Sequence, residues 1–572
     1  MTAPSGEQTE TALLARALAY QKDGHPALAA QLCRQVLALN PERAEALLML
    51  GLILGRGDEP GAGAALIERY LAQRPDDPFA RYNLGMLRQR QGDDAGALAL
   101  LERALALKPD LAPALHGMGA TLHALGRFDE AERAFERALA LEPRDPVARN
   151  NFGDLKRSQG RLDEALAEFD RALALAPELA TAHCNRGVVL AELRRHDEAI
   201  AAFERALALE PDLHRAHFEL AEALEARFRP TEAHRHRVAA VRRHPLVTTA
   251  CTGAQVAARI LVLCSAGRGD VSVKFLLDPA RFEKTLLFLL LPEDATDDYA
   301  RRRATLPPFD IVFNAIADAD RGAPYLSAAA ALCAAHARPV LNPPGRIAPT
   351  RRDRAGALLG GIPGLVVPPT RRVERAALAA RAADPAPFPV PQLLRPVGSH
   401  GGEGLERLNA PADLAAYLAP LGFETFYQTD FCDFRSQDGY WRKYRFVFVD
   451  RVAYPYHLAI ARDWRVHYWR ADMDEAPWMK REEEGFLAEP DAVFTGERGA
   501  AIREIGRRLE LDYAGVDCGI LPDGRVVVFE ANANILVHLN DPPARFGYKH
   551  RYVPRIFEAM SALVLRRAGA AG

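Results

Sequence analysis

The sequence has few cysteines, almost no net charge and no long hydrophobic run. Its seven cysteines are scattered and odd in number, and no two of them have the C-x-x-C spacing of a zinc or redox site. The formal net charge is -2, with 73 basic and 75 acidic residues. This balance indicates a protein that does not bind nucleic acid or a membrane through bulk charge.

Segments for export or membrane insertion are also missing. The longest apolar stretch, residues 285–292, is far too short to span a bilayer and is expected to form a buried strand. The first residues show no basic region followed by an apolar core, which a secretory signal requires. We therefore expect a cytoplasmic protein. Its 572 residues exceed what one hydrophobic core can organise, so several domains are expected.

A period of 34 residues runs through the first half of the chain. Prolines recur at this step (Pro41, Pro75, Pro109, Pro143, Pro177, Pro211 and Pro245). Small residues lie twelve positions before each proline (Ala29, Gly63, Ala97, Ala131, Ala165, Ala199 and Ala233). Further small residues lie another twelve positions earlier (Ala17, Gly51, Gly85, Gly119, Gly153, Gly187 and Ala221). Small residues let two antiparallel helices approach closely, and proline ends the second helix of each pair.

This pattern resembles the tetratricopeptide repeat. The resemblance implies about seven helix pairs over residues 10–245, stacked into an all-α right-handed superhelix with a concave binding face.

Three asparagines occupy the sixth position of their repeats, on the first helix: Asn83, Asn151 and Asn185, with Gly117 in the repeat between the first two. Since first helices line the concave face, these amides are expected to form a partial ladder that binds an extended peptide or protein substrate. The arrangement looks like the asparagine ladder in the repeat domain of O-GlcNAc transferases. Alternatively, the amides are solvated or join neighbouring repeats.

The second half of the chain changes character after Pro245. Residues 259–344 alternate short apolar runs with helical patterns, which predicts a parallel sheet covered by helices. Beyond Pro387 the apolar runs are longer and indicate antiparallel hairpins, with turns at 449–451 and 522–524.

Three motifs follow one another in this half. Residues 395–404 (RPVGSHGGEG) predict a strand that enters a glycine-rich loop, whose backbone N–H groups can wrap phosphate oxygens. Residues 427–433 and 443–445 lie on the next two predicted strands. The third motif is Gly515-Val516-Asp517 followed by Phe529-Glu530-Ala531-Asn532.

The third motif predicts a group of oxygen ligands. Asp517 and Glu530 lie in what is expected to be one hairpin, and Glu530 and Asn532 share a strand face because they are two residues apart. Two carboxylates and an amide oxygen suit Mg²⁺. Taken singly, Asp517 is equally a turn residue and Glu530 an exposed edge residue.

Together the motifs resemble the ATP-grasp superfamily, which includes D-alanine–D-alanine ligase, glutathione-synthetase-like enzymes and ribosomal-protein-modifying glutamate ligases. The resemblance covers about residues 259–566 and implies that ATP and Mg²⁺ are cofactors. It implies Mg²⁺ ligation by Asp517, Glu530 and Asn532, and a catalytic role for Arg445 near the γ-phosphate. The implied nucleotide contacts are Arg354, Arg395, Ser399, Gly401, Gly402, Gly404, Gln428, Asp430 and Asp433.

The expected architecture is therefore multidomain. Residues 10–245 form the repeats, and an α/β nucleotide-fold-like domain spans 258–345. An α+β ATP-grasp fold follows, with an N-terminal lobe and glycine-rich loop over 346–425 and a C-terminal lobe with the Mg²⁺ site over 426–568.

The chain departs from the family pattern at three positions. Arg354 and Arg395 stand where the family usually has lysines, and Lys443 stands where an acid is expected. Arginine keeps the charge but is forked and bulkier, so phosphate binding would have altered geometry.

The resemblance implies a carboxylate–amine ligase that forms a peptide bond through an acyl-phosphate, acting on a peptide or protein held by the repeats. The alternative is a non-catalytic, nucleotide-binding repeat scaffold that mediates protein–protein interaction. A repeat-containing glycosyltransferase would leave the metal triad unexplained. Residues 454–470, rich in aromatics, His and Arg, and the tail 540–552 are candidates for the acceptor side and a substrate loop, or for ordinary core and rim. The sequence identifies neither the two substrates nor the oligomeric state.

Overall fold

The structure, a computed structural model, describes residues 6–57, 59–227, 229–253, 255–267, 270–383, 386–399, 402–466, 473, 476–539 and 546–569. By contacts within the chain it divides into two compact units, residues 1–229 and 230–572, which we describe separately. Among the described residues, no helix combines the length and the apolar character needed to cross a membrane.

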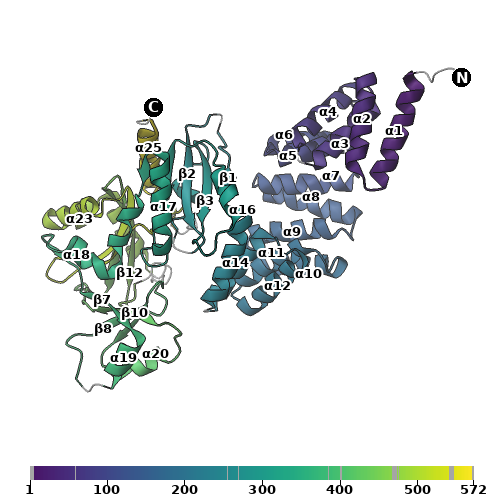
Figure 1. Cartoon of the computed structure of the whole chain (residues 1–572). Helices are drawn as coiled ribbons and strands as arrows, with labels where there is room; N and C mark the ends of the chain where they lie inside the picture. Colours follow the sequence, from purple (N-terminus) through teal and green to yellow (C-terminus); the bar gives the residue numbers. More distant parts are fainter. Residues whose placement is uncertain are drawn as a thin grey trace. The chain divides into compact units, whose positions relative to one another are not determined.

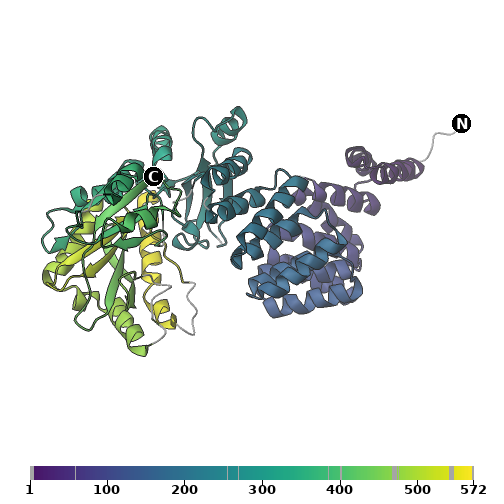
Figure 2. The ribbon, with the colours of Figure 1, turned by 90° about the horizontal axis from the view of Figure 1, so that it is seen from below.

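The first unit consists of helices. They are α1 (Gly6–Lys22), α2 (Pro26–Leu39), α3 (Ala44–Arg56), α4 (Pro60–Gln73), α5 (Pro78–Arg90), α6 (Asp94–Leu107), α7 (Ala112–Ala124), α8 (Phe128–Leu141), α9 (Pro146–Ser158), α10 (Leu162–Leu175), α11 (Ala180–Glu192), α12 (His196–Leu209) and α13 (His214–Ala226). Successive pairs lie side by side in both views (Figures 1 and 2). With α14 (Pro230–Arg243), the described residues hold fourteen repeat helices, which confirms the predicted seven pairs.

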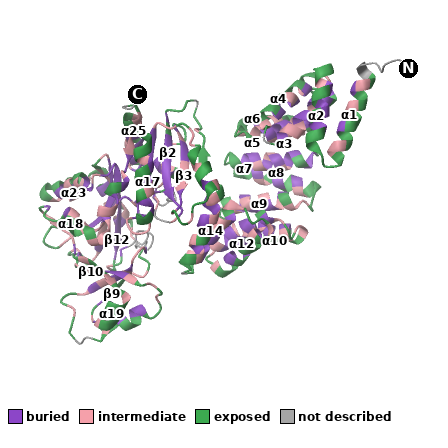
Figure 3. Cartoon of the chain, viewed as in Figure 1, coloured by how far each residue is buried: buried purple, intermediate pink, exposed green. Residues whose placement is uncertain are grey.

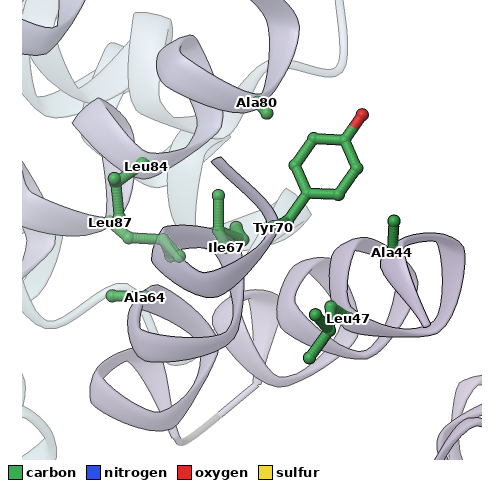
Figure 4. Packing of buried hydrophobic residues seen from close by; sticks show 8 residues of the cluster. All are labelled: Ala44, Leu47, Ala64, Ile67, Tyr70, Ala80, Leu84 and Leu87. Carbon is green, nitrogen blue, oxygen red and sulfur yellow. The ribbon is translucent and has the colours of Figure 1, made fainter. Parts of the chain in front are cut away.

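The small residues of the repeat explain the close packing within a pair. Phe135, Phe169 and Phe203 are fully buried, each facing the glycine of the preceding helix. A Cβ added at Gly153 would lie 2.7 Å from Cε1 of Phe169, closer than real contacts allow. Earlier in the array, one core cluster joins α3, α4 and α5 and includes Leu47, Ile67 and Leu84 (Figure 4). Glycine therefore leaves room for the large apolar side chain that joins the helices.

The last repeat helix, α14, belongs to the second unit by its contacts. His234 Nε2 lies 2.9 Å from Asp294 Oδ2, and Arg242 Nε donates to the Asp294 carbonyl oxygen at 2.8 Å. These contacts tie α14 to the segment before α16 (Asp297–Ala304).

The first sheet of the second unit has the strand order β1-β3-β2-β4-β5. Its strands are β1 (Leu246–Thr249), β2 (Ala258–Ser265), β3 (Phe282–Leu289), β4 (Ile311–Asn314) and β5 (Val340–Leu341), accompanied by α15 (Val273–Leu276) and α17 (Ala323–His336). Strands β2 to β5 are parallel, as predicted, and β1 adds an antiparallel edge that the sequence did not predict. All residues of β2 except Arg259 are buried, as the colouring of this strand shows (Figure 3), and α17 lies along this sheet (Figure 1).

A short connecting region leads to a second, antiparallel sheet with the order β7-β10-β8-β9. The connection holds α18 (Ala355–Leu359) and β6 (Leu365–Val366). The sheet consists of β7 (Thr370–Glu374), β8 (Gln392–Pro396), β9 (Glu406–Leu408) and β10 (Thr425–Asp430). Helices α19 (Arg375–Ala382) and α20 (Asp413–Leu418) cover it, with Leu378, Leu394, Leu414 and Phe426 in the shared core.

The third sheet has the order β12-β11-β13-β14-β6. Its antiparallel strands are β11 (Trp441–Val449), β12 (Val452–Ala461), β13 (Tyr513–Ile520) and β14 (Val526–Asn532), and β6 pairs with β14 in parallel. The associated helices are α21 (Pro477–Ala488), α22 (Pro490–Val493), α23 (Gly496–Leu509) and α25 (Pro554–Gly569). Asp450 and Arg451, both with positive φ, form the predicted turn between β11 and β12. The second unit is therefore a region of mixed sheets.

Candidate functional site

Four ionisable residues form one row across the third sheet. In the strand pairing, His457 of β12 lies opposite Arg445 of β11, Arg445 opposite Asp517 of β13, and Asp517 opposite Glu530 of β14. Directly opposed residues in an antiparallel sheet project from the same face. The predicted hairpin that joins Asp517 to Glu530 is thus present, and Arg445 stands beside it.

Asp517 is held by two cations of β11. Arg445 donates from Nε and Nη2 to the two carboxylate oxygens, and Lys443 Nζ lies 3.1 Å from Oδ2. Burial alone raises the pKa of the Asp517 carboxyl group, but the charges of Arg445 and Lys443 outweigh it and hold this pKa well below its ordinary value. Asp517 is therefore a fully ionised, cation-bound carboxylate.

Glu530 is held in a similar way from another part of the chain. Arg352 Nη2 lies 2.6 Å from Glu530 Oε1, and Asn532 Nδ2 donates to the same oxygen. Burial raises the pKa of Glu530, while Arg352 and Arg395 lower it, with a net lowering. Asn532 Oδ1 accepts from Asn534 N at 3.0 Å, so its amide oxygen turns to the backbone.

Arg395, at the end of β8, adds a further buried cation. Burial, together with the nearby charge of Arg352, lowers the pKa of this guanidinium to about 10. Arg395 donates to the carbonyl and hydroxyl oxygens of Ser399, at the start of the glycine-rich loop. Arg352 and Arg395 thus share the single carboxylate of Glu530 and repel each other. A bound anion would therefore stabilise both guanidinium groups.

A cavity of about 480 Å³ opens beside this row, within the second unit. Arg352, Arg395, Lys443, Arg445, Asp517 and Glu530 line it, together with residues of the second sheet such as Thr429 and Asp430. Aromatic side chains also line it: the Phe431 and Trp464 rings meet edge to face at 5.8 Å. The volume is within the range of small-molecule sites, and the walls combine a cationic and an aromatic part.

A smaller cavity of about 30 Å³ adjoins the first one. The two share Thr350, Arg352 and Glu530 in their walls. In the smaller cavity, the Tyr427 hydroxyl group donates to the Asp320 carboxylate at 2.7 Å. Burial raises the pKa of Asp320.

The structure brings some of the predicted residues to these cavities and leaves others outside. Those that line the larger cavity are Arg395, Gly402, Asp430, Arg445, Asp517 and Glu530, and those that line the smaller one are Ser399, Glu530 and Asn532. Arg354, Gly404, Gln428 and Asp433 line neither. Gln428 donates to Gln392 at 3.1 Å, whereas Arg354 and Asp433 are exposed. Gly401 lies outside the described residues.

Two cations of the site had no assigned role in the sequence. Arg352 lies in the run Arg351–Arg354, in which the resemblance to the ATP-grasp superfamily points to Arg354 instead. Lys443 departs from the family pattern, and the resemblance implies no role for it. The available signal was its position two residues before Arg445, which places both side chains on one strand face.

The candidate acceptor segments are only partly within the described residues. Trp464 and Arg465 line the larger cavity, while His467 and Arg545 lie outside the described residues. Lys549 is buried, and its Nζ lies 3.4 Å from Glu483 Oε1, so it anchors the tail rather than facing a cavity.

The repeat asparagines are joined to one another and to their neighbours. Asn151 Nδ2 donates to His116 Nε2 at 2.8 Å, and Asn150 Nδ2 donates to Asn151 Oδ1 at 3.2 Å. Asn185 Nδ2 donates to Asn150 Oδ1 at 3.0 Å and its Oδ1 accepts from Arg215 at 3.1 Å. This network links α7, α9, α11 and α13, which corresponds to the inter-repeat role named as the alternative.

Asn83 stands apart from that network. Its Nδ2 donates to the Phe79 carbonyl oxygen, four residues earlier in its own helix, at 2.7 Å. The amide is half-buried, and it makes no described bond to a neighbouring repeat.

The side chains of the larger cavity could contact phosphate oxygens, an aromatic base or a metal ion. The cations that line the cavity (Arg352, Arg395, Lys443 and Arg445) suit phosphate oxygens, and the aromatic wall suits a base. A magnesium ion needs carboxylate oxygens directed at it, but Asp517 and Glu530 already accept from Arg445, Lys443, Arg352 and Asn532. Among the described residues, no group of three or more His, Cys, Asp or Glu side chains could hold a metal ion. In the structure, the carboxylates of Asp517 and Glu530 are therefore paired with protein cations, and the predicted set of Asp517, Glu530 and Asn532 remains a prediction.

Comparison with known proteins identifies the first unit. Residues 14–78, 80–144 and 145–212 match family models described as tetratricopeptide repeat. The chain therefore contains tetratricopeptide repeats, as expected from the 34-residue period. A search of curated proteins gave no match.

The solved structures that are similar to this chain include tetratricopeptide repeat proteins. A tetratricopeptide repeat protein from Parabacteroides merdae is 17% identical, with a TM-score of 0.37, over 41% of this chain and 92% of that one. PilF of Pseudomonas aeruginosa is 18% identical, with a TM-score of 0.33, over 38% and 100%. YrrB, described as a TPR protein with an unusual peptide-binding site, is 24% identical, with a TM-score of 0.27, over 35% and 99%.

Proposed function

We propose that this protein is a repeat-based scaffold for protein–protein interaction whose C-terminal unit binds a nucleoside triphosphate. The tetratricopeptide repeats support the first part, because arrays of this kind present extended surfaces for peptides and proteins. The cavity beside the Arg445–Asp517 row supports the second part and carries the proposal.

In the proposed complex, the phosphates lie against the cationic side of the cavity. Arg352 pairs with Glu530, and Arg395 lies close enough to both for the charge of Arg352 to lower its pKa, so these two guanidinium groups share one carboxylate. The base would lie toward Phe431 and Trp464. The Gly398 and Gly402 φ angles of +76° and +80° give the loop after Arg395 a backbone that other residues rarely adopt.

Isothermal titration of the full chain with ATP tests this assignment. Arg395→Ala should weaken binding by about 1.5–3 kcal/mol, the scale of a charge-assisted hydrogen bond. Arg354→Ala is the matched control, because Arg354 is exposed and lines neither cavity; it should bind like the wild type. ATP affinity that is equal in the two variants would place the nucleotide elsewhere.

A second candidate function is a carboxylate–amine ligase. The larger cavity favours it, because Arg352, Arg395 and Arg445 all line this one space of about 480 Å³, where they could contact a transferred phosphoryl group. In this reaction a substrate carboxylate oxygen attacks the γ-phosphorus and ADP leaves. An amine then attacks the acyl carbon, and phosphate leaves with formation of an amide. Arg445, Arg352 and Arg395 would neutralise the charge at the transferred group.

The two functions differ in turnover. A ligase releases ADP and phosphate when both an acceptor carboxylate and an amine are present, whereas a nucleotide-binding scaffold returns ATP unchanged. Coupled measurement of ADP release by the full chain, across a panel of carboxylate-ended peptides with free amino acids as amines, separates them. ADP release that requires a peptide would favour the ligase, and ATP binding without release would favour the scaffold.

A further inference from the structure

The buried end of the larger cavity has more positive than negative charge. Its cations are Arg352, Arg395, Lys443 and Arg445, and its carboxylates are Asp517 and Glu530. Of the other charged groups of the wall, Asp463 and Arg465 are exposed and lie 3.7 Å from each other, and Asp430 accepts a hydrogen bond from the neutral amide of Gln392. Apart from that exposed pair, the wall holds four cations and three carboxylates, Asp430 included, which leaves a surplus of one positive charge.

Lys443 has a specific position in this arrangement. It lies on the same face of β11 as Arg445, and its Nζ is 3.1 Å from Asp517 Oδ2. Its side chain is only 16% exposed, so the ammonium group is committed to the site rather than to solvent. Asp517 thereby receives a compact positive charge from the protein itself.

We infer that Lys443 and Arg445 supply at Asp517 the positive charge that a divalent cation would otherwise supply, so that the cavity binds its polyphosphate ligand as the metal-free anion. This inference rests on the proposed nucleotide binding. The surplus charge attracts the phosphates directly, and the same four cations repel a divalent ion at this short range. Lys443 is the residue that determines this preference, because it places a cation where a metal-dependent site would need a free carboxylate oxygen.

Calorimetric titration of the full chain with ATP, in excess EDTA and then in excess MgCl₂, tests the inference. We expect the dissociation constant in EDTA to equal that with Mg²⁺ within about threefold, or to be the smaller of the two. Binding that is at least tenfold weaker in EDTA would overturn the inference while leaving nucleotide binding in place. The absence of binding under both conditions would overturn the proposed function and the inference with it.

Variants of Lys443 test its role separately from the affinity of the wild-type protein for ATP. Lys443→Glu should lose binding in EDTA and recover it with Mg²⁺ or Mn²⁺, because it adds a carboxylate beside Asp517 and removes one cation. Lys443→Arg should keep metal-free binding. Lys274→Glu is the matched control for the change of charge, since Lys274 is exposed on α15 and lines neither cavity. Metal-free binding by Lys443→Glu at wild-type affinity would contradict the role assigned to Lys443.

Discussion

Arg445 and Asp517 lie directly opposite each other on β11 and β13, and the guanidinium group donates to both oxygens of the carboxylate. Both side chains are removed from most contact with water, at 22% and 5% exposure. A buried pair of this kind is costly to break from one side, because the remaining charge has no solvent to stabilise it.

Asp517→Asn should therefore destabilise the second unit by about 3–5 kcal/mol, since Arg445 and Lys443 would both lose their carboxylate. The four tryptophans (Trp441, Trp464, Trp469 and Trp478) all belong to this unit, so urea unfolding followed by tryptophan fluorescence measures it selectively. Asp450→Asn, which breaks the exposed pair with Arg566, should cost less than about 1 kcal/mol. Equal effects of the two changes would show that the Asp517 pair contributes no more than a surface pair.

Two glycines of α4 should respond in opposite ways to alanine. A Cβ at Gly63 would lie 2.6 Å from the backbone nitrogen of Gly55, whereas a Cβ at Gly61 meets nothing closer than 3.8 Å. Gly63→Ala should destabilise the repeats by about 1–3 kcal/mol, because backbone atoms must move. Gly61→Ala should be neutral or stabilise by up to about 1 kcal/mol through helix propensity. Unfolding followed by far-ultraviolet circular dichroism measures both, and a stabilising Gly63→Ala would contradict the packing described here.

The asparagines of the repeats should differ in their contribution to stability. Asn185→Ala removes the partner of both Asn150 and Arg215 in a buried network and should cost about 1–3 kcal/mol. Asn83→Ala loses only a bond within its own helix and should cost less than about 0.5 kcal/mol. Urea unfolding followed by circular dichroism compares the two. Equal losses of stability in the two variants would show that the hydrogen bonds of Asn185 to other repeats contribute no more than a bond within one helix.

Asp270 should make the second unit less stable as pH rises. Burial raises the pKa of this carboxyl group to about 8 from an ordinary value of 3.8, although Ser265 donates to it and Arg237 opposes the shift. The folded state therefore holds a proton that the unfolded state releases near pH 4. The contribution of Asp270 is fully present below that pH and is lost as pH approaches about 8, with a slope of at most about 1.4 kcal/mol per pH unit.

Asp270→Asn should remove that slope and raise the stability of the second unit near neutral pH. Urea unfolding followed by tryptophan fluorescence at several pH values measures the change. Asp298→Asn, on the exposed face of α16, is the control and should leave the slope as it is. A slope that persists in Asp270→Asn would assign the pH dependence to another group.

Local signals predicted most of the secondary structure. The 34-residue period required several positions to keep one register, and the small residues at those positions identify helix pairs whatever lies around them. In the same way, apolar runs predicted β2, β3, β4 and β11 to β14. A strand that is buried on one or both faces of a sheet has apolar residues at those positions. The edge strand β1 was missed, since four residues with three exposed side chains carry no such pattern.

The sequence by itself determined that the first half is a repeat array and that Asp517 and Glu530 share a hairpin, because both follow from spacing along the chain. Only the tertiary structure decided which cations accompany those carboxylates. Arg352 reaches Glu530 across 178 positions of sequence, and Lys443 reaches Asp517 across 74. Contacts of that kind depend on how separate strands pair and how a connecting segment crosses them, and residue spacing holds no record of either. These contacts matter for binding, because a carboxylate that already accepts hydrogen bonds from two protein cations has fewer free lone pairs for a metal ion or a substrate.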